Sequence, residues 1–197
     1  MKGCNGFSAK NIEQIINYEN GIHELRDKAL NIVTPIVDKW KNNFPNDLDD
    51  LKILGIDKAF TIDGITYPGF YFKNNIYLPR SGVATWDFKI SHEFGHHVFY
   101  KHITPIIESN LDYKQRERFA NAIGYYYEAI LDKKKRKDSI NEAHKQFKDF
   151  LIKIKQDFGK EKYNEIKQWV SSYLQFPLSK LQALFGYIFW LNKGYQT

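Results

Sequence analysis

The stretch HEFGHHVFYKH, residues 92–102, places four histidines and one glutamate within eleven positions. An α-helix turns by about 100° per residue, so His92 and His96 lie one turn apart on the same face and their imidazoles can reach one ion. Glu93 lies beside that ion without having to bind it. The pattern HExxH therefore predicts a zinc site in which Glu93 accepts a proton from an attacking water molecule.

The residues around this motif favour a buried helix. Ile90, Phe94 and Val98 leave the flanks of the motif apolar and uncharged. Thr85 is a suitable N-cap, and Pro105 marks the approximate end of the apolar period. We expect a helix over this range that lies beneath a cleft.

A catalytic zinc ion usually has three protein ligands and one open position, so a further ligand is needed. We prefer Glu117, which stands twenty-one residues after His96 and in the first turns of the next predicted helix. An antiparallel return of the chain would bring it beside the motif. Asn121, one turn further on, is expected to accept the N–H of a ligating histidine.

Other third ligands stay open. His102 completes HExxHxxxxxH, but Phe99 stands where that pattern has a glycine to turn the chain back. A continuing helix would carry His102 about 9 Å further along the axis and far round the cylinder. The acidic alternatives are Glu108, Asp112 and Glu128.

Peptide hydrolysis also needs a donor for the oxyanion, and a tyrosine near the metal commonly supplies it. Tyr113 precedes Glu117 by one turn of the predicted helix. Tyr125 follows Asn121 by one turn. We select Tyr113 and Tyr125 from the thirteen tyrosines, and we interpret His97 as a packing or outer-sphere residue.

Residues 58–80, KAFTIDGITYPGFYFKNNIYLPR, are rich in aromatic and β-branched residues. The pairs Asp63-Gly64 and Asn74-Asn75 are typical of turns between short strands. We therefore predict a small antiparallel meander. Its segment Ile76, Tyr77 and Leu78 is the candidate edge strand for a bound peptide.

Helical patterns occupy the rest of the chain. The predicted helices are 11–43, divided at Gly21, a helix from Asp112 to about 133, a helix from Ser139 to Gly159, and helices 160–174 and 178–192. Asp112 with Gln115 and Ser139 with Glu142 have capping-box spacing. The expected fold is α+β, one mainly helical zincin-like domain over 1–197 made of N-terminal helices (1–45), sheet and metal-binding helices (50–135), and a C-terminal helical part (138–197).

Composition narrows the function. The single cysteine, Cys4, excludes an internal disulfide and a cysteine-based zinc cluster. The net charge of +6 is spread along the chain apart from KKKRK at 133–137, which we interpret as a solvated helix end, so we do not expect nucleic-acid binding. No signal peptide or membrane span is evident, which favours a cytoplasmic protein, with a phage or mobile element as one source.

HEFGH followed by ERFAN resembles the gluzincin class of zinc peptidases, in which HExxH is joined by the glutamate of an ExxxD or ExxxN helix. The order NNIYLP, FKISHEFGHH, ERFAN is similar to ImmA/IrrE-type peptidases. ERFANAIGYYY is similar to the ExxFAxxxxYY helix of Pro-Pro endopeptidases, the lethal factor catalytic domain and phage head-associated peptidases. Over residues 65–130 the resemblance implies His92, His96 and Glu117 as ligands and Glu93 as base. Asn110 stands where the lethal factor group has a tyrosine.

We therefore expect a zinc-dependent endopeptidase that acts on a protein or peptide substrate. The alternative is a catalytically silent zincin-fold module with a binding or regulatory role, or a structural component of a phage or mobile element. The intact Glu93 favours the enzyme, because a silent module has no need of it.

Overall fold

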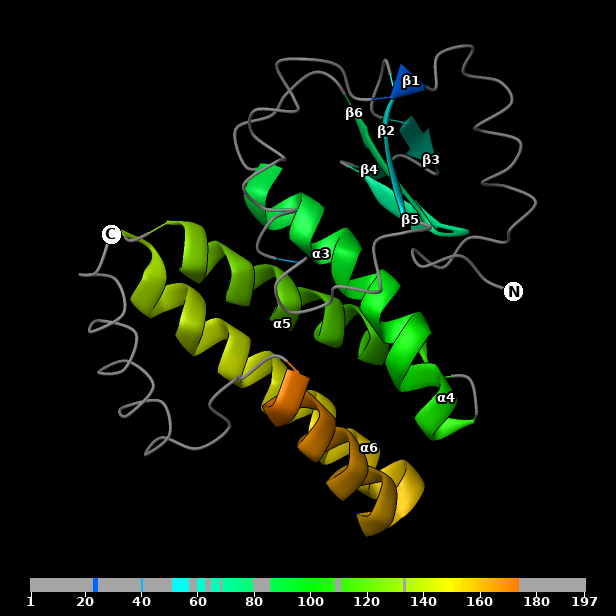
Figure 1. Cartoon of the computed structure of the whole chain (residues 1–197), viewed down its shortest axis with the longest axis vertical. Helices are drawn as coiled ribbons and strands as arrows, with labels where there is room; N and C mark the ends of the chain where they lie inside the picture. The colour runs from blue at the N-terminus through cyan, green and yellow to red at the C-terminus, as the bar shows by residue number, and fades with distance from the viewer. Residues whose placement is uncertain are drawn as a thin grey trace.

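The computed structural model describes residues 23–24, 40, 51–56, 60–62, 65–67, 69–79, 86–108, 111–132 and 134–173. This part of the chain is mainly helical, with a small sheet, as the α+β prediction requires. The sheet, α3 (Trp86–Val98), α5 (Tyr113–Leu131) and α6 (Arg136–Tyr173) follow one another as layers (Figure 1). No helix in the described ranges is both long and apolar enough to cross a bilayer.

Among the described residues, four strands form one sheet in the order β1, β2, β6, β5. Their bounds are His23–Glu24 for β1, Lys52–Ile56 for β2, Phe70–Phe72 for β5 and Asn75–Pro79 for β6. β2 and β6 are parallel, whereas the other pairings are antiparallel. Within the predicted range 58–80, strand 60–62 pairs antiparallel with 65–67 and strand 70–72 with 75–79, as expected, but these pairs lie in two sheets. The prediction of one antiparallel meander is therefore wrong, and the larger sheet is mixed. The cause is β2, a segment that the sequence did not predict as a strand, which pairs with β6 across a long connection.

β6 lies inside this sheet, between β2 and β5. Ile76, Tyr77 and Leu78 are all buried. Successive side chains of a strand point to opposite faces, so both faces of β6 are covered. The prediction that these three residues form an edge strand is wrong, and β5 is the terminal described strand on that side.

The hairpin turns lie close to their predicted positions. β5 and β6 are joined by Lys73 and Asn74, which have φ angles of 46° and 60°. Two successive positive φ angles define the type I′ turn that suits a tight hairpin, so the predicted turn at Asn74-Asn75 is displaced by one residue. β3 (Phe60–Ile62) and β4 (Ile65–Tyr67) pair antiparallel on either side of the predicted turn at 63–64, which itself lies outside the described residues.

The predicted helix 11–43 falls almost entirely outside the described residues. Within it, His23 and Glu24 form β1 and pair with β2, so the helix prediction is wrong there. The edge of β2 offers hydrogen bonds from outside the segment, and such pairing overrides local helix propensity. Trp40 is helical and fully buried, and its ring stacks on Phe94 with 4.0 Å between ring centroids.

The motif lies on a continuous helical segment, as predicted. α3 passes into a π-helical turn, η1 (Phe99–Ile103), and then into α4 (Thr104–Ile107). In η1 the backbone N–H of Thr104 donates to the carbonyl of Phe99, five residues back, which is the π pattern. The predicted N-cap at 85 lies outside the described residues.

The two predicted capping boxes have different outcomes. Asp112 caps α5, because its carboxylate accepts a hydrogen bond of 2.9 Å from the backbone N–H of Gln115. Ser139 does not cap a helix, since α6 already begins at Arg136. Its hydroxyl instead donates to Glu128 at 2.7 Å.

α6 contains two helical segments separated at Gly159, whose φ of 85° and ψ of −178° are not helical. This agrees with the predicted helix end at Gly159 and the new helix at 160. The predicted helix 178–192 lies outside the described residues.

α5 packs between α3 and α6 through an aromatic core (Figure 1). Phe119 of α5 has ring-centroid distances of 5.5 Å to Phe99 and 5.7 Å to Phe147. Its ring also lies 5.3 Å from that of Phe150. These fully or almost fully buried rings fix α5 against both neighbours, and they thereby position the face of α5 that carries Glu117.

Candidate metal centre

His92, His96 and Glu117 converge between α3 and α5. Nε2 of His92 lies 3.4 Å from Oε2 of Glu117, and Nε2 of His96 lies 3.3 Å from Oε1. One ligand atom from each residue lies within 4.8 Å of the other two. The structure thus brings together the two motif histidines and the preferred third ligand at metal-binding distance.

These separations suit a shared ion better than a direct hydrogen bond. Charge-assisted N–H···O bonds measure about 2.7–2.9 Å. Two ligand atoms that are each about 2.1 Å from one tetrahedral ion lie about 3.4 Å apart. Nε2 of His96 and Oε1 of Glu117 are also buried without a hydrogen-bond partner of ordinary geometry. Buried polar atoms without partners are costly, and coordination of one cation would satisfy them.

Small residues allow α3 and α5 to approach closely enough for Glu117 to reach the histidines. A Cβ atom on Gly95 would lie 2.7 Å from Cα of Ala120, and one on Gly124 would lie 2.9 Å from the ring of Phe88. Neither position therefore has room for a side chain without movement. The two glycines and the small Ala120 thus permit the close approach of the two helices.

The environment of His92 and Glu117 sets the protonation states of both side chains. Burial, together with the nearby His96, lowers the pKa of His92 to about 4, while Glu117 and Asn121 oppose the shift. Burial alone would raise the pKa of Glu117, but His96, His92 and Tyr113 outweigh it and lower that pKa. At neutral pH a neutral imidazole therefore faces a carboxylate, which are the protonation states that metal binding requires.

Asn121 lies one turn after Glu117 and acts on the imidazole of His92. Nδ1 of His92 nevertheless has no partner of full hydrogen-bond geometry. Asn121 therefore lies beside His92, as predicted, but the predicted hydrogen bond from the imidazole N–H is not formed.

Glu93 lies close to Glu117 of the ligand group, and one oxygen of its carboxylate faces the sheet. Its side chain is 5% exposed, and burial followed by the charge of Glu117 raises its pKa well above the usual range. A hydrogen bond from the backbone of Tyr71 opposes that rise. Oε2 of Glu93 is buried without a hydrogen-bond partner, whereas Oε1 lies beside Gly69 at the start of β5. One oxygen of the carboxylate therefore faces the start of β5, and the other has no hydrogen-bond partner.

The two selected tyrosines occupy different places. Tyr113 is 42% exposed, and its hydroxyl acts on the carboxylate of Glu117, so it reaches the ligand group. Tyr125 is half-buried and packs on Phe88 at 4.6 Å, and Phe88 in turn lies 6.0 Å from His92. Tyr113 is thus at the site, whereas the ring of Phe88 lies between Tyr125 and His92.

The other acidic and histidine candidates lie outside the group of possible ligands that the described residues form. His102 is in η1, and its ring lies 5.1 Å from that of Trp169 on α6. Glu108 is exposed at the end of α4 with φ of 56°. The carboxylate of Asp112 caps α5. The continuing helix therefore carries His102 away from the motif, as its geometry predicts.

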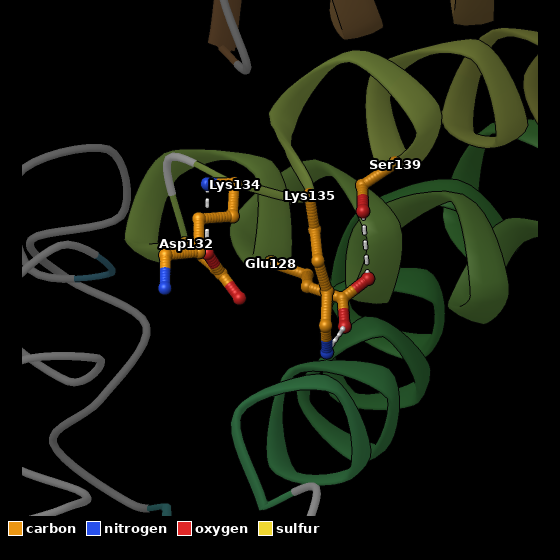
Figure 2. A network of polar contacts seen from close by, with 5 residues as sticks. All are labelled: Glu128, Asp132, Lys134, Lys135 and Ser139. Carbon is orange, nitrogen blue, oxygen red and sulfur yellow. Dashed lines mark hydrogen bonds and ion pairs between the residues drawn. The ribbon is translucent and has the colours of Figure 1, made fainter.

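Glu128 belongs to a separate polar network at the junction of α5 and α6. Figure 2 shows its carboxylate between Lys135, at 3.0 Å, and Ser139, at 2.7 Å. Asp132 accepts the backbone N–H of Lys134 at 2.9 Å. Arg136 donates to the carbonyl of Ala129 in the last turns of α5. The 133–137 block thus contains residues that stabilise a helix junction, in line with the expectation of a solvated helix end.

Two further residues at the site were not identified from the sequence: Gly69, just before β5, and Tyr71 of β5, which lie beside Glu93. His97 contacts Tyr71 and packs on Phe94, in line with its interpretation as a packing or outer-sphere residue. The only local signals were the Pro68-Gly69 pair before a short aromatic run and the doubled histidine of HEFGHH. Neither specifies which strand lies beside Glu93.

No protein-family model, no curated protein and no solved structure matches this chain.

Proposed function

We propose that this chain is a zinc-dependent endopeptidase that hydrolyses peptide bonds of a protein substrate. The observation that carries the proposal is the convergence of two imidazoles and one carboxylate on one point, with the buried Glu93 next to them. Two nitrogen ligands and one oxygen ligand, with a fourth position open, are the donor set of catalytic zinc in peptidases.

His92, His96 and Glu117 would hold the ion. A bound zinc ion supplies Lewis acidity, which polarises a carbonyl and makes a bound water molecule acidic near neutral pH. The remaining chemistry falls to side chains of this chain.

Glu93 would take the proton of the attacking water molecule at Oε2. As the water oxygen bonds to the carbonyl carbon, the carbonyl becomes an oxyanion, to which the hydroxyl of Tyr113 can donate. Glu93 then delivers its proton to the amide nitrogen, and the C–N bond breaks. Both products leave with Glu93 returned to the carboxylate, so the cycle balances.

The experiment compares wild-type protein with Glu93→Gln, after zinc loading, on denatured casein and on a fluorogenic peptide mixture. We expect Glu93→Gln to retain one zinc per chain and to lose about 10²- to 10⁴-fold in kcat, the usual contribution of a general base. Metal content is measured by elemental analysis.

Three results would contradict the proposal. Equal cleavage by wild type and Glu93→Gln would show that Glu93 is not the general base. Iron in place of zinc would indicate the other chemistry that two histidines and one carboxylate support, that of Fe(II) oxygenases. Zinc binding with no cleavage of either probe would favour the silent-module alternative.

A further inference from the structure

A buried hydrogen-bonded pair lies behind the general base. The hydroxyl of Tyr71 lies 3.1 Å from Nδ1 of His97, and the two side chains are 5% and 1% exposed. Tyr71 comes from β5 and His97 from α3, so this contact joins the sheet to the motif helix. The third histidine of HEFGHH, which is not one of the proposed ligands, makes this connection.

The direction of this hydrogen bond follows from a second contact. The Tyr71 hydroxyl donates to Oδ1 of Asn74 at 2.9 Å. A hydroxyl has one proton, so towards His97 its oxygen must accept, and Nδ1 of His97 must carry the hydrogen. The geometry therefore assigns the Nδ1-protonated form to His97.

The backbone of Tyr71, in contrast to its side chain, faces Glu93. The backbone of Tyr71 lies close enough to the Glu93 carboxylate to lower its pKa. Oε2 has no hydrogen-bond partner, and Oε1 is the oxygen that faces Gly69, so this segment of chain approaches the carboxylate at Oε1. β5 thus holds one oxygen of the carboxylate and leaves the other for proton transfer.

We propose that His97 is a positioning residue for Glu93: its Nδ1–H holds the Tyr71 side chain, which fixes β5 so that the backbone N–H of Tyr71 orients the carboxylate. The catalytic part of this inference rests on the proposed function, in which Glu93 is the base. The structural part, from His97 through Tyr71 to Glu93, stands apart from any activity.

Ring packing supports a rigid arrangement. The His97 ring also packs on Phe94, with 6.0 Å between centroids, and the Tyr71 ring stacks on Tyr100 at 5.9 Å. These contacts confine both rings. If the hydrogen bond between His97 and Tyr71 were lost, the ring packing would remain in part, but the backbone of Tyr71 would no longer be held in one orientation.

The test uses His97→Leu, which keeps apolar bulk but lacks the donor, and His97→Asn, whose side-chain N–H can replace Nδ1–H. His144→Leu on α6 is the matched control. Protein labelled with ¹⁵N-tyrosine reports the Tyr71 amide, identified by its loss in Tyr71→Phe. The amide resonance should move upfield in His97→Leu and in Glu93→Gln, and stay near its wild-type position in His97→Asn and His144→Leu.

With zinc loaded and the fluorogenic peptide mixture as probe, His97→Leu should lower kcat about 10- to 100-fold with KM unchanged, as expected for a displaced catalytic group. His97→Asn should recover most of that loss. An unmoved Tyr71 amide in His97→Leu, or equal kcat in His97→Leu and wild type, would overturn the proposal. If wild type cleaves neither probe, the proposed function fails, and the amide shift still decides whether His97 positions Glu93.

Discussion

Glu93 combines two conflicting requirements in one side chain. In the proposed mechanism it must be ionised to accept a proton, yet it is buried beside another carboxylate, and both factors raise its pKa. The hydrogen bond from β5 offsets part of that rise. The residue that carries the chemistry is therefore expected to reduce the stability of the folded chain, as catalytic groups often do.

This conflict gives a pH-dependent prediction for protein kept in chelator. The folded pKa of Glu93 lies above that of the unfolded chain, so wild type loses stability as pH rises from about 4.3 through the folded value. Glu93→Gln removes this loss and should melt at a higher temperature than wild type at pH 7. The difference should vanish below pH of about 4. Thermal melts across pH measure it.

Glu117→Gln is the matched control, since the pKa of Glu117 is shifted downwards. A lowered carboxylate pKa stabilises the fold above the unfolded pKa, and this contribution disappears as pH falls through the folded value. Glu117→Gln should therefore melt lower than wild type at pH 7. Equal melting temperatures of Glu93→Gln and wild type at pH 7 would show that ionised Glu93 does not destabilise the fold.

At this scale the sequence identified the three residues that converge, His92, His96 and Glu117, but not the residues that surround Glu93. Helix geometry places His92 and His96 on one face. The prediction of Glu117 required only one further assumption, that the next helix runs back antiparallel to the first. The contact of Tyr71 with Glu93 depends on where β5 lies over α3, which no local pattern encodes. Tyr113 and Tyr125 looked equivalent by spacing, and only the packing distinguishes them.

The crossing of α3 and α5 is the structural element on which the ligand group depends. It is close because Gly95 faces the backbone of Ala120, and Gly124 faces Phe88. An alanine would favour either helix by about 1 kcal/mol over glycine. At these two positions packing opposes that preference.

We predict that Gly95→Ala lowers the free energy of unfolding by about 1–3 kcal/mol, the usual cost of overpacking, because its Cβ would meet backbone atoms that cannot turn aside. It should also weaken zinc binding, since α5 must move away with Glu117. Gly124→Ala is the control: its Cβ meets the edge of the Phe88 ring, which can rotate, so its loss should be smaller. Urea denaturation in chelator and zinc competition titrations measure both. A Gly95→Ala protein that is more stable than Gly124→Ala would contradict this account.

The elements divide by the range of the interactions that form them. Helical periods and the Asp112 cap were readable because their partners lie within four residues. β2 was missed, since it forms through parallel pairing with a strand about twenty residues away. Ser139 resembled Asp112 as a cap, but the hydrogen bond to Glu128 from the preceding helix decided its role.

For the whole molecule, the three ligands tie α3 to α5 in the middle of the layered structure (Figure 1). An ion that binds the folded chain and not the unfolded chain stabilises it by mass action, about 2.7 kcal/mol at a free concentration of 100 times Kd. For a chain of this size that corresponds to a rise in Tm of roughly 5–10 °C. We predict such a rise on addition of zinc.

Two variants assign that rise to the ligand group. Glu117→Ala should abolish most of it, because only two ligands remain. His102→Asn should preserve it, since His102 packs against Trp169 and not at the site. A normal zinc response in Glu117→Ala together with its loss in His102→Asn would instead assign the third ligand to His102.

The most direct measurement is a crystal structure of the zinc-loaded chain with anomalous data collected at the zinc absorption edge. The predicted result is one strong peak between α3 and α5, about 2.0–2.2 Å from Nε2 of His92, Nε2 of His96 and one carboxylate oxygen of Glu117. A peak bound elsewhere, or no peak in protein saturated with zinc, would contradict the metal centre and the peptidase proposal with it.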